Sequence, residues 1–423
     1  MRVLLVQSYL GGAEPPVYPI GLASVRASLN DHEVRALDTN LSKDPFGELK
    51  AVLKEFVPEV IGISLRNIDS TNKRKVVFYY KYLKEIIDVI RPVSSAKIAV
   101  GGSGFSMFAK EIMDDEQRID YGVFLEGENT FPALLNNLGS PEKVKSVYYR
   151  ENGKVRFTGL GEQVNLNKVN PPDRGLFDLS RYNGVPDSIG IETKRGCMLK
   201  CIYCIYGFLN GKDLRMREPG LVVDEIENIL KKGGKSFTFV DAVFNIPLSH
   251  AEAICREIIK RGIKVSWSAW FHEEALKEDF VKLCKEAGCT KFILSPDGFS
   301  DRILETLGKN LRKKHIVKTL DTFGNVPGVE VCYNFFKNPP GQDMAAFLNL
   351  VGFFVKTKRR LGNRAHFEFN SIRIEPHTSL YNIALNEGFV KRSDTLLFPK
   401  YYTNPKTFYI EKLFNMILRL KGK

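Results

Sequence analysis

The sequence predicts an α/β protein in which a doubly wound, Rossmann-like parallel sheet precedes a partial (β/α)6 barrel and a short C-terminal tail. Two series of apolar strand segments alternate with amphipathic helix segments, and a proline-bearing stretch separates the two series. The chain has 423 residues, which is too long for one ordinary core. We therefore predict four parts, comprising residues 1–140, 141–185, 186–385 and 386–423.

The first series consists of short apolar runs that each precede a segment with helical periodicity. Its expected strands are residues 2–7, 32–38, 59–65, 96–102 and 121–127, and its expected helices are residues 21–31, 46–56, 77–91, 108–115 and 130–138. Strands joined through helices run parallel, and such sheets bind ligands beyond the carboxyl ends of their strands. The loops expected there, QSYLGGAEPP, SLRNIDS, GGSGFS and EGENT, are rich in Gly, Ser and Asn. GGSGFS lacks the third glycine of a dinucleotide fingerprint.

The stretch 141–185 is interpreted as a connector between the two series. Residues 147–157 resemble a hairpin that turns at Asn152-Gly153, and residues 170–182 form a crossing segment with two prolines.

The second series predicts the barrel. Its expected strands are residues 187–193, 236–242, 264–270, 291–295, 328–336 and 365–374, with helix-like segments between them. Barrels of this type place their active sites at the carboxyl ends of the strands. The tail after residue 385 ends in a basic amphipathic helix.

Composition restricts the class of partner. The net charge of +13 has two interpretations, which are a solvated basic surface and a surface that attracts an anionic partner. No aromatic and basic motif of a nucleic-acid module is present, and no apolar run approaches the ~20 residues of a membrane helix. The first residues lack the features of a signal peptide, so we expect a cytoplasmic protein without a membrane span or a nucleic-acid partner.

Three of the seven cysteines lie within eight residues, in the segment TKRGCMLKCIYC. Cys197, Cys201 and Cys204 follow the first expected barrel strand, whereas the remaining four are scattered among expected core positions. Thiolates suit zinc or iron–sulfur clusters, but structural zinc needs a fourth ligand, and the next histidine is His250. A [4Fe–4S] cluster held by three cysteines leaves one iron open to an outside ligand.

At these residues the sequence resembles the radical SAM superfamily, whose C-x-x-x-C-x-Φ-C signature is matched by Cys197, Cys201, Tyr203 and Cys204. The resemblance implies that S-adenosylmethionine (SAM) binds the open iron through its amino and carboxylate groups and is cleaved to a 5′-deoxyadenosyl radical. It also implies that Tyr203 packs beside the cluster.

Further SAM-binding positions follow from the same resemblance. Asp241 ends the second barrel strand, where family members bind the methionine amino group, although their Gly-Gly-Glu pattern is absent. Ser295 and Asp297 end the fourth strand, which contacts the ribose or carboxylate of SAM. Residues 372–381, with Arg373, resemble the last-strand segment that packs on adenine. Ordinary barrel or loop packing is the alternative role for each of these residues.

The N-terminal series resembles the cobalamin-binding domain that is fused to many radical SAM enzymes. The likeness rests on PxGLA (19–23), HEVxxxD (32–38), VxGIS (60–64), GG (101–102) and EGE (126–128). It implies that cobalamin contacts the strand-end residues, which are Ser64, Arg66, Gly101, Gly102, Ser103, Glu126 and Gly127. A flavodoxin-like domain without a cofactor is the alternative.

The cobalt-ligating signature D-x-H-x-x-G is absent from this chain. Arg66 follows the third strand, and a guanidinium is permanently charged and has no lone pair to offer cobalt. One hypothesis places Arg66 under the corrin, where it excludes a water ligand. The other gives Arg66 a surface or phosphate-contacting role.

The resemblance implies a cobalamin-dependent radical SAM C-methyltransferase that acts on an unactivated carbon. The expected substrate is a peptide or protein residue, such as one in methyl-coenzyme M reductase, or a small molecule, and the expected electron donor is an external flavodoxin-like or ferredoxin-like protein. Rearrangement or cyclisation, methyl transfer without a radical, and a non-catalytic cobalamin or metal sensor are the alternatives. The acid–base residue and the oligomeric state are not assigned from the sequence.

Overall fold

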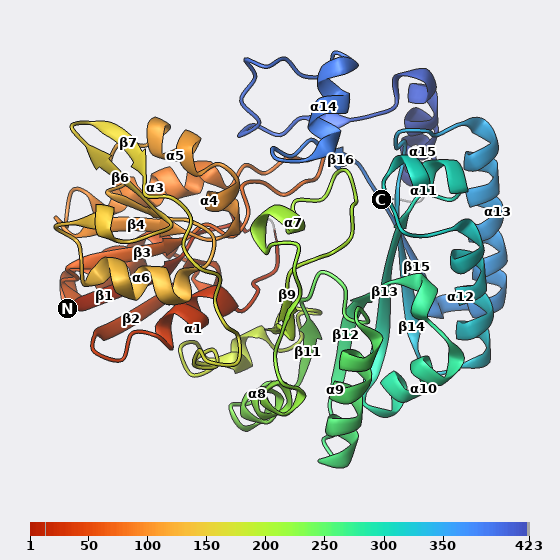
Figure 1. The fold of residues 1–423 in the computed structure, drawn as a ribbon, viewed down its shortest axis with the longest axis horizontal. Coiled ribbons are helices and arrows are strands. Elements are labelled where there is room, and N and C mark those ends of the chain that lie inside the picture. The colour runs from red at the N-terminus through yellow and green to blue at the C-terminus, as the bar shows by residue number, and fades with distance from the viewer. Residues whose placement is uncertain (13, 421–423) are drawn as a thin grey trace. The chain divides into compact units, whose positions relative to one another are not determined.

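The computed structural model describes residues 1–12 and 14–420, and the side chains up to residue 416. Its internal contacts divide the chain into two units (Figure 1). The first unit comprises residues 1–70, 75–190 and 228–234, and the second comprises residues 71–74, 191–227 and 235 onward. The last three residues of the predicted tail lie outside the described residues.

The first unit contains a seven-stranded sheet with the order β2-β1-β3-β4-β5-β6-β7. Its five parallel strands are β1 (Arg2–Gln7), β2 (Glu33–Asp38), β3 (Val60–Ser64), β4 (Lys97–Gly101) and β5 (Tyr121–Val123). This order reverses direction between β1 and β3, and ligands of doubly wound sheets bind at such a switch point. The predicted sheet is therefore confirmed.

The segment that the sequence marks as a connector contributes two strands to this sheet. β6 (Val147–Glu151) pairs antiparallel with β5 and with β7 (Lys154–Phe157). Asn152 and Gly153 at the hairpin tip both have positive φ, at 50° and 76°, as a two-residue turn between twisted strands requires.

The helices of the first unit begin and end within a few residues of the expected positions. They are α1 (Ile20–Arg26), α2 (Pro45–Phe56), α3 (Tyr80–Ile90), α4 (Ser103–Met107), α5 (Ala109–Asp115) and α6 (Gly127–Leu135). β5 ends at Val123, earlier than expected, because the chain turns there and Glu126 becomes the N-cap of α6. Pro132 is the sixth of the nine residues of α6, and it lacks the N–H that would donate to the carbonyl four residues earlier.

The second unit contains the predicted partial barrel, a six-stranded sheet with the order β15-β14-β13-β12-β11-β8. These strands are β8 (Gly190–Ile191), β11 (Ser236–Phe239), β12 (Ser266–Phe271), β13 (Cys289–Asp297), β14 (Glu330–Phe336) and β15 (Ala365–Asn370). The helices between them are α8 (Pro219–Lys231), α9 (Leu248–Lys260), α10 (Glu278–Glu286), α11 (Asp301–Thr306), α12 (Lys313–Asn325) and α13 (Met344–Leu361). Gly190 of β8 and the end of α8, from residue 228, are grouped with the first unit. Stacked and edge-to-face aromatic rings, including Phe239, Phe244 and Trp267, fill its core.

The barrel differs from the prediction at both of its edges. The first expected strand shortens to β8 and is followed by an antiparallel pair, β9 (Lys194–Arg195) and β10 (Arg215–Met216). The last expected strand divides into β15 and β16 (Ile372–Arg373), and β16 pairs with β17 (Tyr401–Tyr402). The tail adds α14 (Ser379–Asn386) and α15 (Phe408–Leu420).

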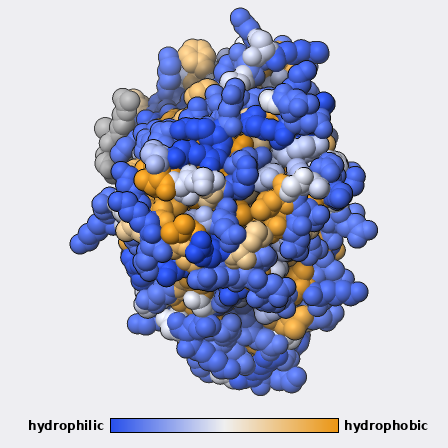
Figure 2. Space-filling model, turned by 90° about the vertical axis from the view of Figure 1, so that its left-hand side faces the viewer, coloured by the Kyte–Doolittle hydropathy of each residue, from blue (hydrophilic) through white to orange (hydrophobic). Residues whose placement is uncertain are grey.

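The outer surface is predominantly hydrophilic on the face that Figure 2 shows, where hydrophobic side chains gather in small groups. Small apolar groups of this kind are ordinary on protein surfaces. Among the described residues, no helix combines the length and the apolar character that crossing a membrane requires.

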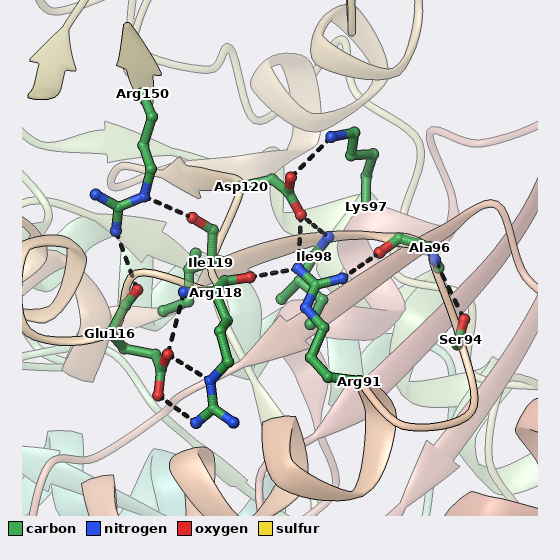
Figure 3. A network of polar contacts seen from close by, with 10 residues as sticks. All are labelled: Arg91, Ser94, Ala96, Lys97, Ile98, Glu116, Arg118, Ile119, Asp120 and Arg150. Carbon is green, nitrogen blue, oxygen red and sulfur yellow. Dashed lines mark hydrogen bonds and ion pairs between the residues drawn. The ribbon is translucent and has the colours of Figure 1, made fainter. Parts of the chain in front are cut away.

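A network of charged side chains joins the amino end of β4 to the chain that leads into β5 (Figure 3). Asp120 accepts hydrogen bonds from the backbone of Ile98 at 2.9 Å, from Lys97 at 2.9 Å and from Arg91 at 2.8 Å. Burial alone would raise the pKa of Asp120, but these three donors outweigh it and the pKa is lowered. The network lies at the end of the sheet opposite to the ligand-binding edge, so we assign it to stability.

Replacing Asp120 by Asn should lower the free energy of unfolding by about 1–3 kcal/mol at neutral pH, because charge-assisted hydrogen bonds are lost. A lowered carboxyl pKa stabilises the fold above the unfolded-state pKa of about 4, and that contribution disappears as the pH falls through the folded-state value. The difference between variant and parent should therefore shrink in acid. Denaturant titrations at neutral and acidic pH measure it, with Asp114→Asn as the control, because Asp114 pairs with Lys110 on the surface. An equal effect of both substitutions would contradict the assignment.

Candidate cofactor and active site

The three clustered cysteines lie in a tight loop, residues 196–204, which we call the cysteine loop. It joins β9 to α7 (Tyr206–Leu209). The loop begins at Gly196, whose φ is +100° and whose Cβ, if present, would overlap the carbonyl oxygen of Asp213. The backbone N–H of Cys197 donates to the Gly211 carbonyl at 3.0 Å. A residue without a side chain is thus needed immediately before the first cysteine.

A turn at Gly308 holds the middle of the cysteine loop. The N–H of Ile202 donates to the Leu307 carbonyl at 3.0 Å, and Gly308 has a φ of +67°. A Cβ on Gly308 would clash with the carbonyl oxygen of Lys200. Ile202 and Tyr203 also pack on a buried cluster formed by Ile303, Leu307 and Ala346. The loop therefore rests on the turn that follows α11.

The cysteine loop opens into a cavity of about 760 Å³ within the second unit. Cavities that bind cofactors commonly have volumes in this range. The lining comes from the carboxyl ends of several barrel strands and from the segment after β16. It includes Cys197, Cys201, Cys204, Tyr203, Asp241, Glu273, Ser295, Asp297, Lys309 and His377. The barrel thus brings together the cysteines, Tyr203, Asp241, Ser295 and Asp297, as their positions at strand ends predict.

Tyr203, Asp297 and Lys309 form a buried polar group on one wall of the cavity. The Tyr203 hydroxyl donates to Asp297, Lys309 forms an ion pair with the same carboxylate, and Lys309 also donates to the Ser295 carbonyl at 2.6 Å. Burial raises the pKa of Asp297 and of Tyr203. The pKa of Lys309 is raised too, because Asp297 and neighbouring anionic groups outweigh the effect of its burial. The wall therefore carries fixed charges that remain paired inside the protein.

The Asp241 carboxylate is hydrogen-bonded and ion-paired to Thr193 and Lys194, which lie at the start of β9. It accepts hydrogen bonds from the N–H groups of Thr193 at 2.7 Å and Lys194 at 3.2 Å, and from the Thr193 hydroxyl. Its ion pair with Lys194 is 3.0 Å long, and the two side chains are 0% and 2% exposed. Breaking such a pair typically costs about 3–5 kcal/mol. These contacts tie β9, and hence the cysteine loop, to the end of β11.

Arg373 is held away from the cavity lining. Its guanidinium pairs with Glu375 at 2.6 Å and donates to the Leu396 carbonyl at 2.9 Å. Among the described residues, the same segment instead reaches the cavity through His377, Thr378 and Ser379. His377 stacks on Phe208 with ring centroids 4.1 Å apart. An adenine-binding role for Arg373 remains a prediction.

Two charged residues of the cavity, Glu273 and Lys309, were not singled out from the sequence. Glu273 follows β12 and begins a 3-10 turn, Glu273–Ala275. It is 4% exposed, and burial raises its pKa to about 7. The available signal was its position directly after a barrel strand, but neighbouring Glu274 has the same side chain and faces solvent. Only the turn geometry distinguishes the two carboxylates.

The donor set of the cysteine loop fits an iron–sulfur cluster. All three cysteines are free and half-buried. Burial raises the pKa of Cys201, and that of Cys204 to about 12, while Lys309 acts in the opposite direction on both. Within the described part of the chain, no three His, Cys, Asp or Glu side chains are arranged to hold a single metal ion. A cluster binds each cysteine through a separate iron, so it does not require the three sulfurs to converge on one point.

The residues expected to contact cobalamin lie at the carboxyl edge of the first unit's sheet. Ser64 is the last residue of β3 and Arg66 follows the strand. Nη2 of Arg66 lies 3.5 Å from Glu14 in the loop after β1. The Arg66 Nε atom is buried without a hydrogen-bond partner. An unpaired buried donor at the β1/β3 switch point fits a polar ligand there.

The glycine-rich loop after β4 packs against the Arg66 loop. Gly102 has a φ of +97°, and a Cβ there would lie 2.7 Å from the Leu65 carbonyl oxygen. Ser103 donates to the Arg66 carbonyl at 2.7 Å, and the Gly104 N–H donates to the same atom at 2.9 Å. The close packing of these two backbones explains why the segment GGSG is rich in glycine. The same packing positions Arg66.

Glu126 and Gly127 lie at the start of α6. Glu126 accepts a hydrogen bond from the Val164 N–H at 2.7 Å. A Cβ on Gly127 would lie 3.0 Å from the Val25 side chain. Contacts of Ser64, Arg66, Gly101, Gly102, Ser103, Glu126 and Gly127 with a cofactor stay predictions.

Comparison with known proteins agrees with one candidate site in each unit, at the carboxyl edge of the first sheet and at the cysteine loop. Residues 8–135 match the B12 binding domain, and residues 191–353 match the radical SAM superfamily. The chain thus carries a B12 binding domain followed by a radical SAM domain, as the sequence motifs imply. These two domains imply a [4Fe–4S] cluster, SAM and cobalamin as cofactors, and the donor sets described above fit them.

An uncharacterized methyltransferase of Pyrococcus horikoshii is 27% identical over 72% of this chain and 67% of its own length. An anaerobic magnesium-protoporphyrin IX monomethyl ester cyclase of Cereibacter sphaeroides is 23% identical over 73% of this chain and 52% of its own length. The solved structure of the methyltransferase TsrM from Kitasatospora setae, with cobalamin and a [4Fe–4S] cluster bound, has a TM-score of 0.77 and 21% identity. The aligned region covers 96% of this chain and 76% of the TsrM chain.

Replacing Gly196 by Ala should lower the iron and sulfide content of the reconstituted protein by at least about half. The added Cβ would displace the start of the cysteine loop, and a left-handed φ is itself unfavourable for alanine. Gly207→Ala is a matched control, because Gly207 lies in α7 beside the same loop with nothing within 4 Å of the added Cβ. Iron and sulfide assays after anaerobic reconstitution measure the effect. Equal cluster content in both variants would show that the Gly196 conformation is not required.

Proposed function

We propose that this protein is a C-methyltransferase that transfers a methyl group from SAM, through cobalamin, to an unactivated carbon. The observation that carries the proposal is the single cavity that collects the three cysteines together with Tyr203, Ser295, Asp297 and Lys309. The family membership supports the same reading, because the same chain carries a B12 binding domain.

The proposed overall reaction consumes two SAM molecules and two electrons for each methyl group transferred. The products are the methylated substrate, 5′-deoxyadenosine, methionine and S-adenosylhomocysteine, which together account for every atom of the two SAM molecules and the abstracted hydrogen. The cofactors supply the radical and carry the methyl group, while the protein binds and orients them. The electrons are proposed to come from an external flavodoxin-like or ferredoxin-like protein.

The proposed roles follow from where the residues lie. Cys197, Cys201 and Cys204 would hold the cluster, and Tyr203 would pack beside it. Ser295 and Asp297 would contact SAM from the end of β13, where Lys309 fixes both residues. Asp241 would act near the amino group from the end of β11, with its carboxylate orienting the backbone of Thr193 and Lys194. In the first unit, Arg66 would lie under the corrin and exclude water from the cobalt.

The proposed substrate is an amino-acid residue of a peptide or protein, of which methyl-coenzyme M reductase is an example, or a small molecule. A structure of TsrM contains a tryptophan substrate together with a SAM analogue. This supports the proposal that an amino-acid side chain reaches the cavity. Cyclisation is the second candidate reaction, because a relative named as a cyclase matches 73% of this chain.

Product analysis tests the proposed reaction. Methyl-labelled SAM should add one labelled CH2 unit to the product and yield 5′-deoxyadenosine and S-adenosylhomocysteine together. Cyclisation would leave the substrate without an added methyl group, and methyl transfer without a radical would yield no 5′-deoxyadenosine. A sensor would turn over no SAM.

Replacing Cys197, Cys201 and Cys204 together by Ala should abolish cluster binding and 5′-deoxyadenosine formation, because the cluster ligands are lost, and should leave cobalamin binding intact. Cys332→Ala is the control, since this buried cysteine lies in β14 and is absent from the cavity lining described above. Ultraviolet–visible spectra report the cluster and the corrin in one sample. Retention of the cluster by the triple variant would refute the proposed site.

Replacing Arg66 by Ala should admit a water ligand to the lower face of bound cobalamin, because a permanently charged group without a lone pair is removed. The electron paramagnetic resonance spectrum of the cob(II)alamin form should change from four-coordinate to five-coordinate. Arg35→Ala serves as the control, because Arg35 pairs with Glu55 on the surface. An unchanged spectrum for the Arg66 variant would place this side chain away from cobalt.

A further inference from the structure

The helix α13 is apolar on both of its sides over most of its length. Residues 344–355 contain one polar side chain, that of Asn349, whose amide donates to the Ala345 carbonyl at 2.9 Å. The inner side is buried in the barrel through residues such as Phe347 and Phe353. The other side is exposed, and we call its apolar residues the outer stripe: Met344, Leu348, Val351 and Val355.

The outer stripe forms one continuous face of the helix. Its residues are spaced i, i+4, i+7 and i+11, and residues at this spacing lie along one side of an α-helix. The four residues are between 38% and 59% exposed, although a helix that is apolar all round is normally buried on every side. Figure 1 shows α13 along the outer side of the second unit's sheet. Single exposed apolar residues are ordinary, but a continuous row of them indicates a surface that another molecule covers.

Cations continue the outer stripe at the carboxyl end of α13. An open groove of about 620 Å³ is lined there by Gly352, Val355, Lys356, Arg359 and Arg360. Arg360 pairs with Asp321 at 2.7 Å, whereas Lys356 and Arg359 have no ion-pair partner among the described residues. The helix dipole favours cations in a last turn, but it does not explain the exposed apolar residues before them. The face therefore fits a partner that presents apolar side chains next to acidic ones.

The inner side of the same helix lies against the cysteine loop. Ala346 belongs to the buried cluster on which Ile202 and Tyr203 pack. Tyr203 precedes Cys204 and lines the cavity that contains the three cysteines. An α-helix with its side chains is about 10 Å across, so the outer stripe lies about one helix diameter from the cysteine loop. A protein bound to the outer stripe would thus be close to the iron–sulfur cluster.

We propose that the outer stripe and its basic end dock the acidic electron-carrier protein that reduces the cluster. The inference rests on the proposed function, in which an external flavodoxin-like or ferredoxin-like protein supplies the electrons. The reduced carrier would lose one electron and the oxidised cluster would gain it, with no proton or group transferred. Acidic side chains of the carrier would face Lys356 and Arg359, and its apolar side chains would pack on Leu348.

Two other occupants fit this face less well. A second copy of the chain would bring its own net charge of +13 and a second basic groove to the same surface. A helix that binds at a membrane surface has a charged face opposite its apolar face, whereas the face of α13 opposite the outer stripe is buried in the barrel. We therefore expect a protein partner of opposite charge.

Anaerobic binding and reduction experiments on the reconstituted full-length protein test this docking surface. The probes are an acidic flavodoxin and an acidic ferredoxin, each reduced beforehand, and photoreduced deazaflavin is the small reductant for comparison. Leu348→Glu should weaken carrier binding, measured by biolayer interferometry, by about tenfold or more, because an apolar contact is replaced by a repelling charge. Cluster reduction by the carrier, followed by electron paramagnetic resonance, should slow correspondingly. Reduction by deazaflavin, which needs no docking surface, should change by less than about twofold.

Arg359→Glu provides a second variant at an exposed position in the last turn of α13. It should weaken carrier binding by about threefold or more at low salt, and the difference should shrink at high salt because exposed charges are screened. Leu221→Glu and Lys264→Glu are the matched controls, since they make the same changes at exposed positions in α8 and before β12. Both controls should bind the carriers as the parent protein does.

Equal carrier binding by Leu348→Glu and Leu221→Glu would overturn the proposal, and so would a parent protein that neither carrier reduces. Co-sedimentation with anionic phospholipid vesicles tests a membrane as the occupant, and sedimentation velocity tests a second copy. Vesicle binding or a dimer that Leu348→Glu abolishes, with carrier binding unchanged, would also overturn the proposal.

This inference and the proposed function fail in different experiments. If the protein does not methylate, the selective loss of carrier binding in Leu348→Glu still appears. If α13 does not dock the carrier, the parent protein still forms its labelled product with a small reductant.

Discussion

The ion pair between Lys309 and Asp297 is the interaction on which the arrangement of the active site depends. The two side chains are 11% and 7% exposed, and the Tyr203 hydroxyl and the Ser295 carbonyl complete their partners. Removing one member of such a pair leaves an uncompensated charge, so the three elements that carry them must stay together. Those elements are the cysteine loop, the end of β13 and the turn at Gly308.

The same turn explains why the cysteine loop has one conformation. Gly308 brings the backbone against Lys200, and Leu307 accepts the Ile202 N–H. On its other side the loop is tied to β11, through β9 and the buried pair of Lys194 with Asp241. Three cysteines close in sequence are thus held between two buried ion pairs. The protein fixes the cluster ligands by charges and glycine conformations that lie outside the cysteine motif itself.

The sequence predicted the fold and the cysteine site more completely than the polar contacts around them. Alternation of strands and helices identified both sheets, because burial imposes a regular pattern on apolar residues. It did not reveal that the connector pairs with β5, or that the last barrel strand breaks before β16. Strand pairing depends on partners far away in the chain. Ser295 and Asp297 line the cavity as expected. Arg373 instead pairs with Glu375 and donates to the Leu396 carbonyl. Local sequence does not determine which acceptors a long side chain contacts.

The sequence by itself determined the order of the two folds, the three cysteines and the two domain types that the chain carries, because these depend on short motifs and on periodicity. The tertiary structure decided which charges meet in the cavity. Glu273 and Glu274 are adjacent and chemically identical, yet one is buried beside Lys309 and the other faces solvent. The 3-10 turn after β12 separates them, and its orientation is set by packing against distant parts of the barrel. Burial and the loss of solvating water raise the pKa of Glu273 to about 7, which its sequence position alone does not indicate.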